Sequence, residues 1–186
     1  MKVVLDACVL FPTVMREVLT HVAAKGLYTP LWSARILEEW ARAARKIAPD
    51  GELQARAEVA LLRAAWPKAE VAPHGGLEAR LYLPDANDIH VLATAISSSA
   101  DLIVTNNAKD FPRQYLAEEG LQRQDPDQFL MACLARDPDA VAEAVEQVRQ
   151  DANRISGEIW STRALMKKAR LPRLGKALSK SIPDRI

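Results

Sequence analysis

Short apolar segments that alternate with helical segments are the feature that most constrains the fold of this chain. Segments 2–5 (KVVL) and 102–104 (LIV) are brief, apolar and rich in β-branched residues, which is typical of strands buried on both faces. Two further strands are predicted over 27–32 and 70–72. Between the strands, apolar residues recur at helical spacing, for example over 86–98. This alternation predicts an α/β fold, with a parallel sheet covered by helices on both faces.

The last third of the chain is predicted to be helical. Apolar spacing indicates helices over 126–135 and 138–155, and each begins with a proline, which suits a first helical turn. We therefore expect an α/β domain over residues 1–125 and a helical C-terminal extension over residues 126–186.

Length and composition favour a globular protein that works away from membranes. The 186 residues are 49% hydrophobic, and no apolar run reaches the roughly 18 residues that span a bilayer. The start, MKVVLDACVLFP, has an acid inside its apolar stretch and no small-residue cleavage site, which argues against a signal peptide. Cys8 and Cys133 lack zinc-ligand spacing, so we expect free buried thiols. These features predict a cytoplasmic protein.

Charge is distributed unevenly along the chain. Residues 161–186 carry eight Lys or Arg residues and one acid, Asp184, a formal charge of +7; the other residues sum to −6, giving the net +1. The basic residues are Arg163, Lys167, Lys168, Arg170, Arg173, Lys176, Lys180 and Arg185. Such a tail either binds a phosphate backbone or an acidic protein, or is a solvated amphipathic helix.

Several acids and one amide follow the predicted strands or begin the predicted helices. They are Asp6 after the first strand, Asp88 in the first turn of the helix over 86–98, and Asn107 and Asp110 after the strand over 102–104. Ligands of parallel sheets collect outside the carboxyl ends of the strands, so we expect these side chains to converge.

Two of the predicted helices carry an acid beside their apolar side. Apolar residues follow Asp88 at three and four positions, so its carboxylate shares the buried edge of that helix. Glu39 neighbours Trp40 in a similar way. A charge in such a place needs a partner or a metal ion. Asp85 is either an N-cap or a second carboxylate at the same site.

Converging carboxylates without His or Cys favour Mg²⁺ or Mn²⁺ over zinc. The chemistry that fits is metal-assisted attack of water on a phosphodiester. Taken singly, each acid is more commonly a turn residue or a helix cap, and it is their joint placement that favours a site. The three histidines receive no predicted role: His21 and His74 lack metal-ligand spacing, and His90 lies about 200° around the helix from Asp88.

The segments that carry these residues resemble the PIN domain, a ribonuclease fold shared by VapC-type toxins of bacterial toxin–antitoxin pairs. VVLDACVLFP resembles the family's first strand, with its aspartate at Asp6. LWSARILEEW resembles the second-helix segment, and the alignment selects Glu39 over Glu38. LPDANDIHVLATA resembles the D-x-x-D-x-x-V-L-A-x-A segment, whose second aspartate is Asp88.

The fourth segment, DLIVTNNAKDFP, resembles the end of the family's fourth strand. Many relatives have T-x-D there, and one subgroup has T-x-N-x-x-D-F-P, which matches Asn107 and Asp110. A neutral amide coordinates through oxygen but brings one negative charge fewer, which should either weaken metal binding or select a different coordination geometry.

The resemblance implies a three-layer α/β/α sandwich with a central parallel sheet, and a Mg²⁺- or Mn²⁺-dependent endoribonuclease. It also implies a toxin with a cognate antitoxin protein, and a homodimer. The implied catalytic residues are Asp6, Glu39, Asp88 and Asp110, and the implied metal ligands are Asp6, Asp88, Asn107 and Asp110.

Two other functions are open from the sequence. One is a catalytically weak PIN-like module that binds RNA or protein through the basic tail. The other is an aspartyl-phosphate enzyme built on Asp6, but that chemistry favours a D-x-D continuation, which Asp6-Ala7-Cys8 does not supply.

Overall fold

The computed structural model describes residues 1–181, which form two compact units. The first unit contains Met1–Phe11 and Thr29–Gln124 and holds the sheet. The second contains Pro12–Tyr28 and the described residues from Asp125 onward, and it is helical. Among residues 1–181, no helix combines the length and the apolar character needed to cross a bilayer.

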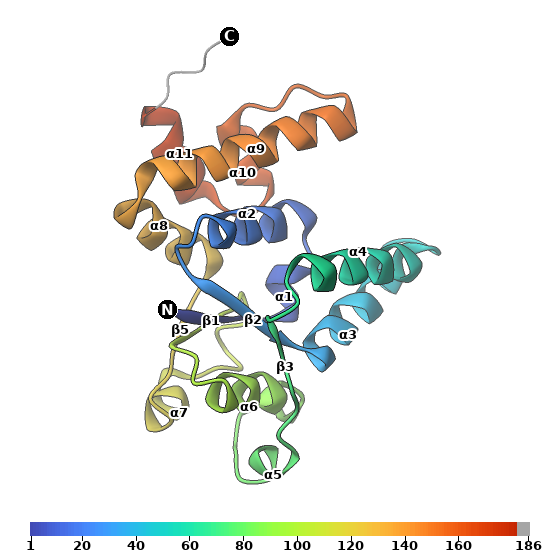
Figure 1. Cartoon of the computed structure of the whole chain (residues 1–186), viewed down its shortest axis with the longest axis vertical. Coiled ribbons are helices and arrows are strands. Elements are labelled where there is room, and N and C mark those ends of the chain that lie inside the picture. The colour runs from blue at the N-terminus through green and yellow to red at the C-terminus, as the bar shows by residue number, and fades with distance from the viewer. Residues whose placement is uncertain (182–186) are drawn as a thin grey trace. The chain divides into compact units, whose positions relative to one another are not determined.

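A five-stranded parallel sheet forms the centre of the first unit (Figure 1). Its strands are β1 (Lys2–Leu5), β2 (Thr29–Ser33), β3 (Glu70–Val71), β4 (Leu102–Val104) and β5 (Gln122–Gln124). The order across the sheet is β3-β2-β1-β4-β5, and every neighbouring pair is parallel. The β-branched and leucine side chains of β1 and β4 are buried, as expected for strands covered on both faces. The predicted α/β class with a parallel sheet is confirmed.

Helices of the first unit connect and cover these strands. They are α1 (Ala7–Leu10), α3 (Ala34–Ala43), η1 (Ala44–Lys46), α4 (Gly51–Ala65), α5 (Gly75–Glu78), η2 (Ala86–Asp88), α6 (Ile89–Ser97) and α7 (Arg113–Glu118). Helix α6 packs on β1, β2 and β4, and Figure 1 shows α4 and α6 on opposite sides of the strands. Ser33 caps α3 as predicted, because its hydroxyl accepts a hydrogen bond from the Ile36 N–H at 3.2 Å.

The second unit contains α2 (Thr13–Ala24), α8 (Pro126–Arg136), α9 (Pro138–Ser156), α10 (Thr162–Lys168) and α11 (Pro172–Ser181). Helix α2 packs against α9 and α8, and α11 packs against α10 and α8. The predicted C-terminal helices are therefore present, and α2 joins them in one packed unit. The division of the chain into domains at residue 125 stays a prediction.

Strand β5 was not expected from the sequence. Its residues, QRQ, are polar and exposed or half-buried, so they carry none of the apolar pattern that reveals β1 and β4. The strand exists because it pairs with β4, in the register Leu102↔Gln122 and Val104↔Gln124, at the edge of the sheet. This pairing extends the sheet by one strand beyond β4.

Candidate metal centre

The first part of the site is the point where β1 and β4 end side by side. Leu5 is in register with Val104, so Asp6 and Thr105 leave the sheet next to each other. The Asp6 N–H donates to the Val104 carbonyl at 3.1 Å, which extends the pairing by one residue. The chain continues from β1 to β2 on one side, while β4 lies on the other. The crevice outside such a reversal of strand order is where open α/β sheets bind ligands.

Asp6 is held in place by short hydrogen bonds. Its side chain is 5% exposed, and Oδ2 accepts hydrogen bonds from the Thr105 hydroxyl at 2.6 Å and from the Cys8 thiol at 3.0 Å. Burial, and next the charge of Asp6, raise the pKa of the Cys8 thiol to about 12. The thiol therefore stays protonated at neutral pH and acts as a donor to the carboxylate. The two cysteines are free, as predicted, although Cys8 is only half-buried.

The loop after β4 folds back toward the start of α6. The Thr105 hydroxyl accepts a hydrogen bond from the Asn107 N–H at 2.9 Å, and the Asn107 amide group donates to Asp88 Oδ2 at 3.2 Å. The Asp110 N–H then donates to the Asn107 carbonyl at 3.3 Å. The backbone of this loop thus brings Asn107 and Asp110 to Asp88, as the positions after β4 predicted.

Three carboxylates form the tightest acidic group among the described residues. Asp85, Asp88 and Asp110 each offer one oxygen, and these oxygens lie within 4.8 Å of one another. Asp85 also accepts a hydrogen bond from the Asn87 N–H at 2.9 Å, so it caps the turn η2. Both roles that the sequence left open for Asp85, as cap and as second carboxylate, are present together. Asp6 is not a member of this three-residue group.

The charges of the other acids act on Asp88. Its pKa is raised from 3.8 to about 6, first by burial and then by the charges of Asp6, Asp85, Asp110 and Glu39, in that order. Five carboxylates, those of Asp88 and of these four residues, therefore come from four separate segments of the chain and lie close enough for their charges to interact. The four acids predicted from the sequence are all among them.

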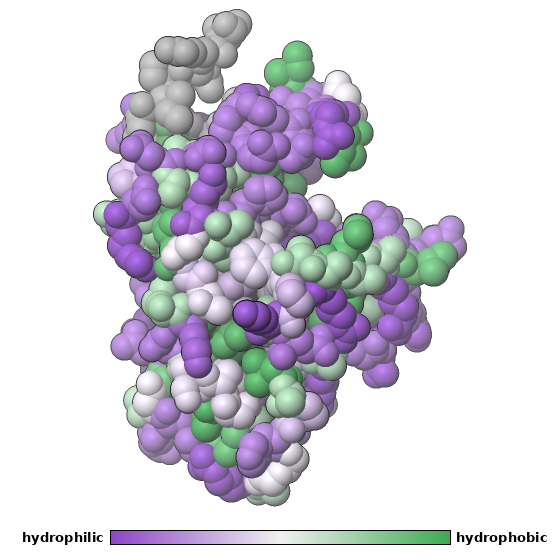
Figure 2. Space-filling model, in the orientation of Figure 1, coloured by the Kyte–Doolittle hydropathy of each residue, from purple (hydrophilic) through white to green (hydrophobic). Residues whose placement is uncertain are grey.

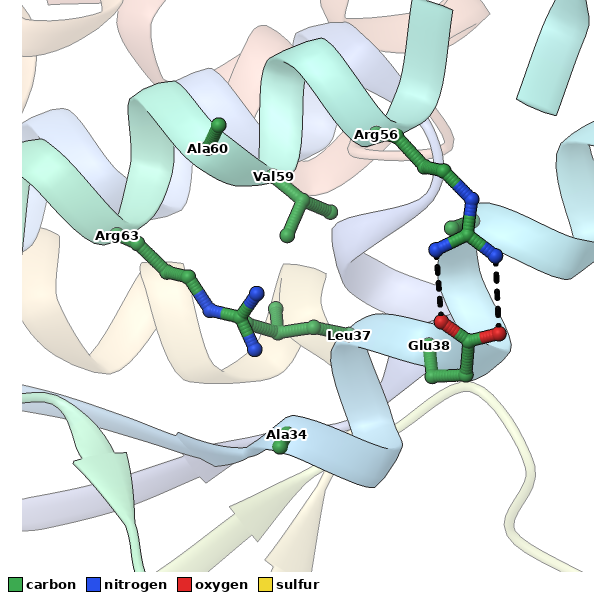
Figure 3. Close-up of a pocket in the computed structure, with 8 residues that line it drawn as sticks. Ala34, Leu37, Glu38, Arg56, Val59, Ala60 and Arg63 are labelled. Atoms are coloured by element: carbon green, nitrogen blue, oxygen red, sulfur yellow. Dashed lines mark hydrogen bonds and ion pairs between the residues drawn. The ribbon is translucent and has the colours of Figure 1, made fainter. Parts of the chain in front are cut away.

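Glu38 and Glu39 are neighbours in sequence but have different surroundings. Glu38 lies over a groove of about 310 Å³ between α3 and α4, where Arg56 grips its carboxylate at 2.9 and 3.0 Å (Figure 3). Hydrogen bonds from Arg56 and Arg42 lower the pKa of Glu38 to about 2. Glu38 is therefore engaged in surface ion pairs, while the charge of Glu39 acts on Asp88.

His90 is a neighbour of Glu39 that the sequence analysis missed. Its side chain is 3% exposed, and Nε2 lies 2.8 Å from Glu39 Oε1. The ring N–H is not directed along that line, so neither ring nitrogen has a hydrogen-bond partner within residues 1–181. Helical periodicity could not reveal this contact, because it compared His90 with Asp88 on its own segment, whereas Glu39 comes from α3. Arg35 also approaches Glu39, at 3.5 Å from Nε.

A model of the PIN domain matches residues 2–109, more than half of the chain. The chain belongs to the PIN-domain family. PIN domains are typically metal-dependent nucleases, and the three-aspartate group is compatible with that chemistry. No curated protein and no solved structure matched the chain.

The donor set of this PIN domain fits a hard divalent cation. The tight group supplies carboxylate oxygens and no His or Cys ligand, which favours Mg²⁺ or Mn²⁺. A cation would also offset the burial and the repulsion by other acids that together raise the pKa of Asp88. The amide nitrogen of Asn107 faces Asp88, so its oxygen would face a cation there only after the amide turns over. Asn107 as a metal ligand stays a prediction.

Proposed function

We propose that this PIN-domain protein is an endoribonuclease that hydrolyses RNA phosphodiester bonds with Mg²⁺ or Mn²⁺. The observation that supports it best is the group formed by Asp85, Asp88 and Asp110, whose carboxylate oxygens lie within 4.8 Å of one another. Clustered carboxylates repel one another, so such a group is expected where a cation is bound during function.

Asp6, Asp88 and Asp110 hold the cation in this proposal, with Asp85 beside them and the Asn107 oxygen as a neutral ligand. The bound cation supplies electrostatic stabilisation of the phosphate charge and a more acidic water. Glu39 accepts the proton of the water that attacks phosphorus. The bond from phosphorus to the 3′ oxygen then breaks, which leaves a 5′-phosphate, while the departing 3′ oxygen takes a proton from solvent. Thr105 keeps the Asp6 carboxylate oriented throughout.

Asp6→Asn and Asp88→Asn test the proposal directly. Each should lower the rate of Mn²⁺-dependent cleavage of an end-labelled RNA by about 100-fold or more, since each removes a charged ligand of the proposed cation. Asp139→Asn is the matched control, because Asp139 is exposed on α9 of the second unit and should leave cleavage unchanged. Full cleavage by both site variants would refute the site.

We further propose that the enzyme is the toxin of a toxin–antitoxin pair and acts on RNA in the cytoplasm. Support for this comes from the resemblance of the four sequence segments to VapC-type toxins. Induced expression should arrest growth, and expression of Asp88→Asn should not. A small DNA-binding protein encoded next to this gene should lift the arrest when both are expressed. Arrest by the inactive variant would contradict the toxin assignment.

A homodimer through α4 is also proposed. Leu53 and Leu61 on this helix are 73% and 71% exposed, whereas Ala55, Val59 and Leu62 face the protein. Apolar side chains therefore gather on the outside of α4 (Figure 2), and single soluble chains seldom leave such a stripe uncovered. Leu53→Glu with Leu61→Glu should convert a dimer into a monomer in light scattering. A wild-type chain that is already monomeric would refute the dimer.

A further inference from the structure

Helices α10 and α11, with the turn between them, form a strongly basic element that we call the basic hairpin (residues 161–181). Seven Lys or Arg side chains project from it, and all are exposed: Arg163, Lys167, Lys168, Arg170, Arg173, Lys176 and Lys180. The hairpin contains no Asp or Glu. Arg185 and Asp184, the other charged residues of the tail, lie outside the described residues.

The basic hairpin is a packed structure. Leu165, Met166, Leu171, Leu174 and Leu178 are buried between its helices and against α8. Gly175 permits this close approach, because a Cβ there would lie 2.8 Å from the Met166 Cβ. The cations are thus held on a folded scaffold, so little backbone conformational entropy remains to be lost when a ligand binds.

The start of α11 is fixed by a carboxylate from α8. Asp127 is 6% exposed, and its oxygens accept hydrogen bonds from the Arg173 N–H at 2.8 Å and the Leu174 N–H at 3.0 Å. From this anchored start, Arg173, Lys176 and Lys180 follow at intervals of three and four residues, so they share one face of α11. That face presents three cations along one helix.

Within residues 1–181, the cations of the hairpin have no acidic partner, unlike several exposed arginines elsewhere in the chain. Arg42, Arg80 and Arg154 lie 2.7, 3.0 and 2.8 Å from the carboxylates of Glu38, Glu119 and Asp151. No ion pair is found for any of the seven hairpin cations within the part of the chain that the structure describes. Lys168 instead lies over the Trp160 ring, 4.4 Å from its centre. The positive charge of the hairpin is therefore uncompensated.

We propose that the basic hairpin binds the phosphate backbone of single-stranded RNA. A protein partner would favour exposed large apolar side chains at the centre of the contact, and those of the hairpin are all buried. The exposed side chains are cations and small residues, which suit a polyanion and contact it independently of base sequence. This inference rests on the proposed function for the choice of RNA, and it adds a second place where the substrate is held.

The test is the salt dependence of RNA binding, measured by fluorescence anisotropy with a labelled single-stranded oligonucleotide in EDTA. The variant Arg173→Gln, Lys176→Gln, Lys180→Gln should bind about tenfold more weakly at low salt. It should also lower the slope of log affinity against log salt by about 2, because each phosphate contact on a single strand contributes about 0.7. Thermal unfolding should be unchanged, since all three side chains are exposed.

The matched control removes three paired cations: Arg42→Gln, Arg80→Gln, Arg154→Gln. It has the same net charge as the hairpin variant and should keep the wild-type slope. Equal losses from both triple variants would overturn the proposal, as would an acidic polyglutamate peptide that displaces the RNA at equal charge concentration. Because binding is measured in EDTA, this test is independent of the nuclease proposal. If the hairpin binds RNA but the protein does not cleave RNA in Mn²⁺, only the nuclease proposal is refuted. If the protein cleaves RNA but the hairpin variant keeps the wild-type salt slope, only the hairpin proposal is refuted.

Discussion

The acidic site of the first unit and the basic hairpin of the second show two ways in which a protein carries uncompensated charge. In the acidic site, burial and the charges of four other acids together raise the pKa of Asp88 to about 6. In the hairpin, seven exposed cations lie on two helices and the turn between them, and none has an acidic partner among the described residues. Charges in the first region interact strongly because they are close and partly buried, whereas exposed charges are screened.

The acidic site and the basic hairpin should therefore depend on different properties of their charged side chains. A metal centre requires oxygens at particular positions, so its function should depend on geometry. A phosphate-binding surface depends on the number of cations and less on where each one lies. Substitutions that preserve charge but change position should therefore separate the regions.

The largest effect is expected from Asp88→Glu, which keeps the charge and moves the carboxylate by one methylene. Cleavage of RNA should fall by about 100-fold, because small displacements at a reacting centre cost this much. The corresponding change in the hairpin, Arg173→Lys, should leave RNA affinity within about twofold in the anisotropy measurement. Equal tolerance of the two changes would remove the contrast.

A smaller effect is expected at His90, which we assign as a positioning residue for Glu39. His90→Leu should lower kcat about tenfold with little change in KM, because the Glu39 carboxylate loses the imidazole that lies 2.8 Å from it. His90→Gln should recover most of the rate, since its amide nitrogen reaches nearly the place of Nε2. If the kcat of His90→Gln is as low as that of His90→Leu, and both variants melt at a lower temperature than the wild type, then His90 is a packing residue only.

Stability distinguishes an acid whose charge is stabilised by backbone N–H groups from an acid whose charge is disfavoured by burial and by other acids. Asp127→Asn should reduce the free energy of unfolding by about 1–2 kcal/mol, because its charge is stabilised by two N–H groups of α11. Asp88→Asn should have the opposite effect in EDTA and raise the melting temperature, because it removes a charge that burial and neighbouring acids disfavour. Thermal unfolding of both variants measures this. A loss of stability in Asp88→Asn would contradict the repulsion.

The smallest effect is a pH dependence of the metal-free protein. The folded-state pKa of Asp88, about 6, is above its ordinary value of 3.8, so folding favours the protonated form. This contribution to stability is fully present below 3.8 and is lost as the pH rises through about 6. The melting temperature of the wild type should therefore fall relative to Asp88→Asn over that interval. Parallel curves for the two proteins would show that Asp88 titrates normally.

The sequence predicted those strands that are short apolar segments, and those acids that directly follow such strands. The segments KVVL and LIV were predicted with the bounds that β1 and β4 have, because buried β-branched runs have few alternatives. Placement after those strands also predicted that Asp6 and Asp110 approach Asp88, since parallel strands present their carboxyl ends at one edge.

Features that depend on contacts between distant segments were not predictable. The polar strand β5 forms only because β4 offers an edge, and His90 gains its neighbour Glu39 from another helix. The amphipathic pattern of the tail did not show that it folds into two helices around Gly175, which lies against Met166. Local periodicity records which side of a segment is apolar but not what the segment packs against.

The most direct test of the account is a calorimetric titration of the metal-free protein with Mn²⁺. The wild type and the control Asp139→Asn should bind Mn²⁺ equally, and the affinity should fall about tenfold or more in Asp88→Asn and in Asp110→Asn, since each removes one charged oxygen ligand. Absence of Mn²⁺ binding by the wild type, or binding that neither aspartate variant weakens, would contradict the conclusion that these carboxylates form a cation site.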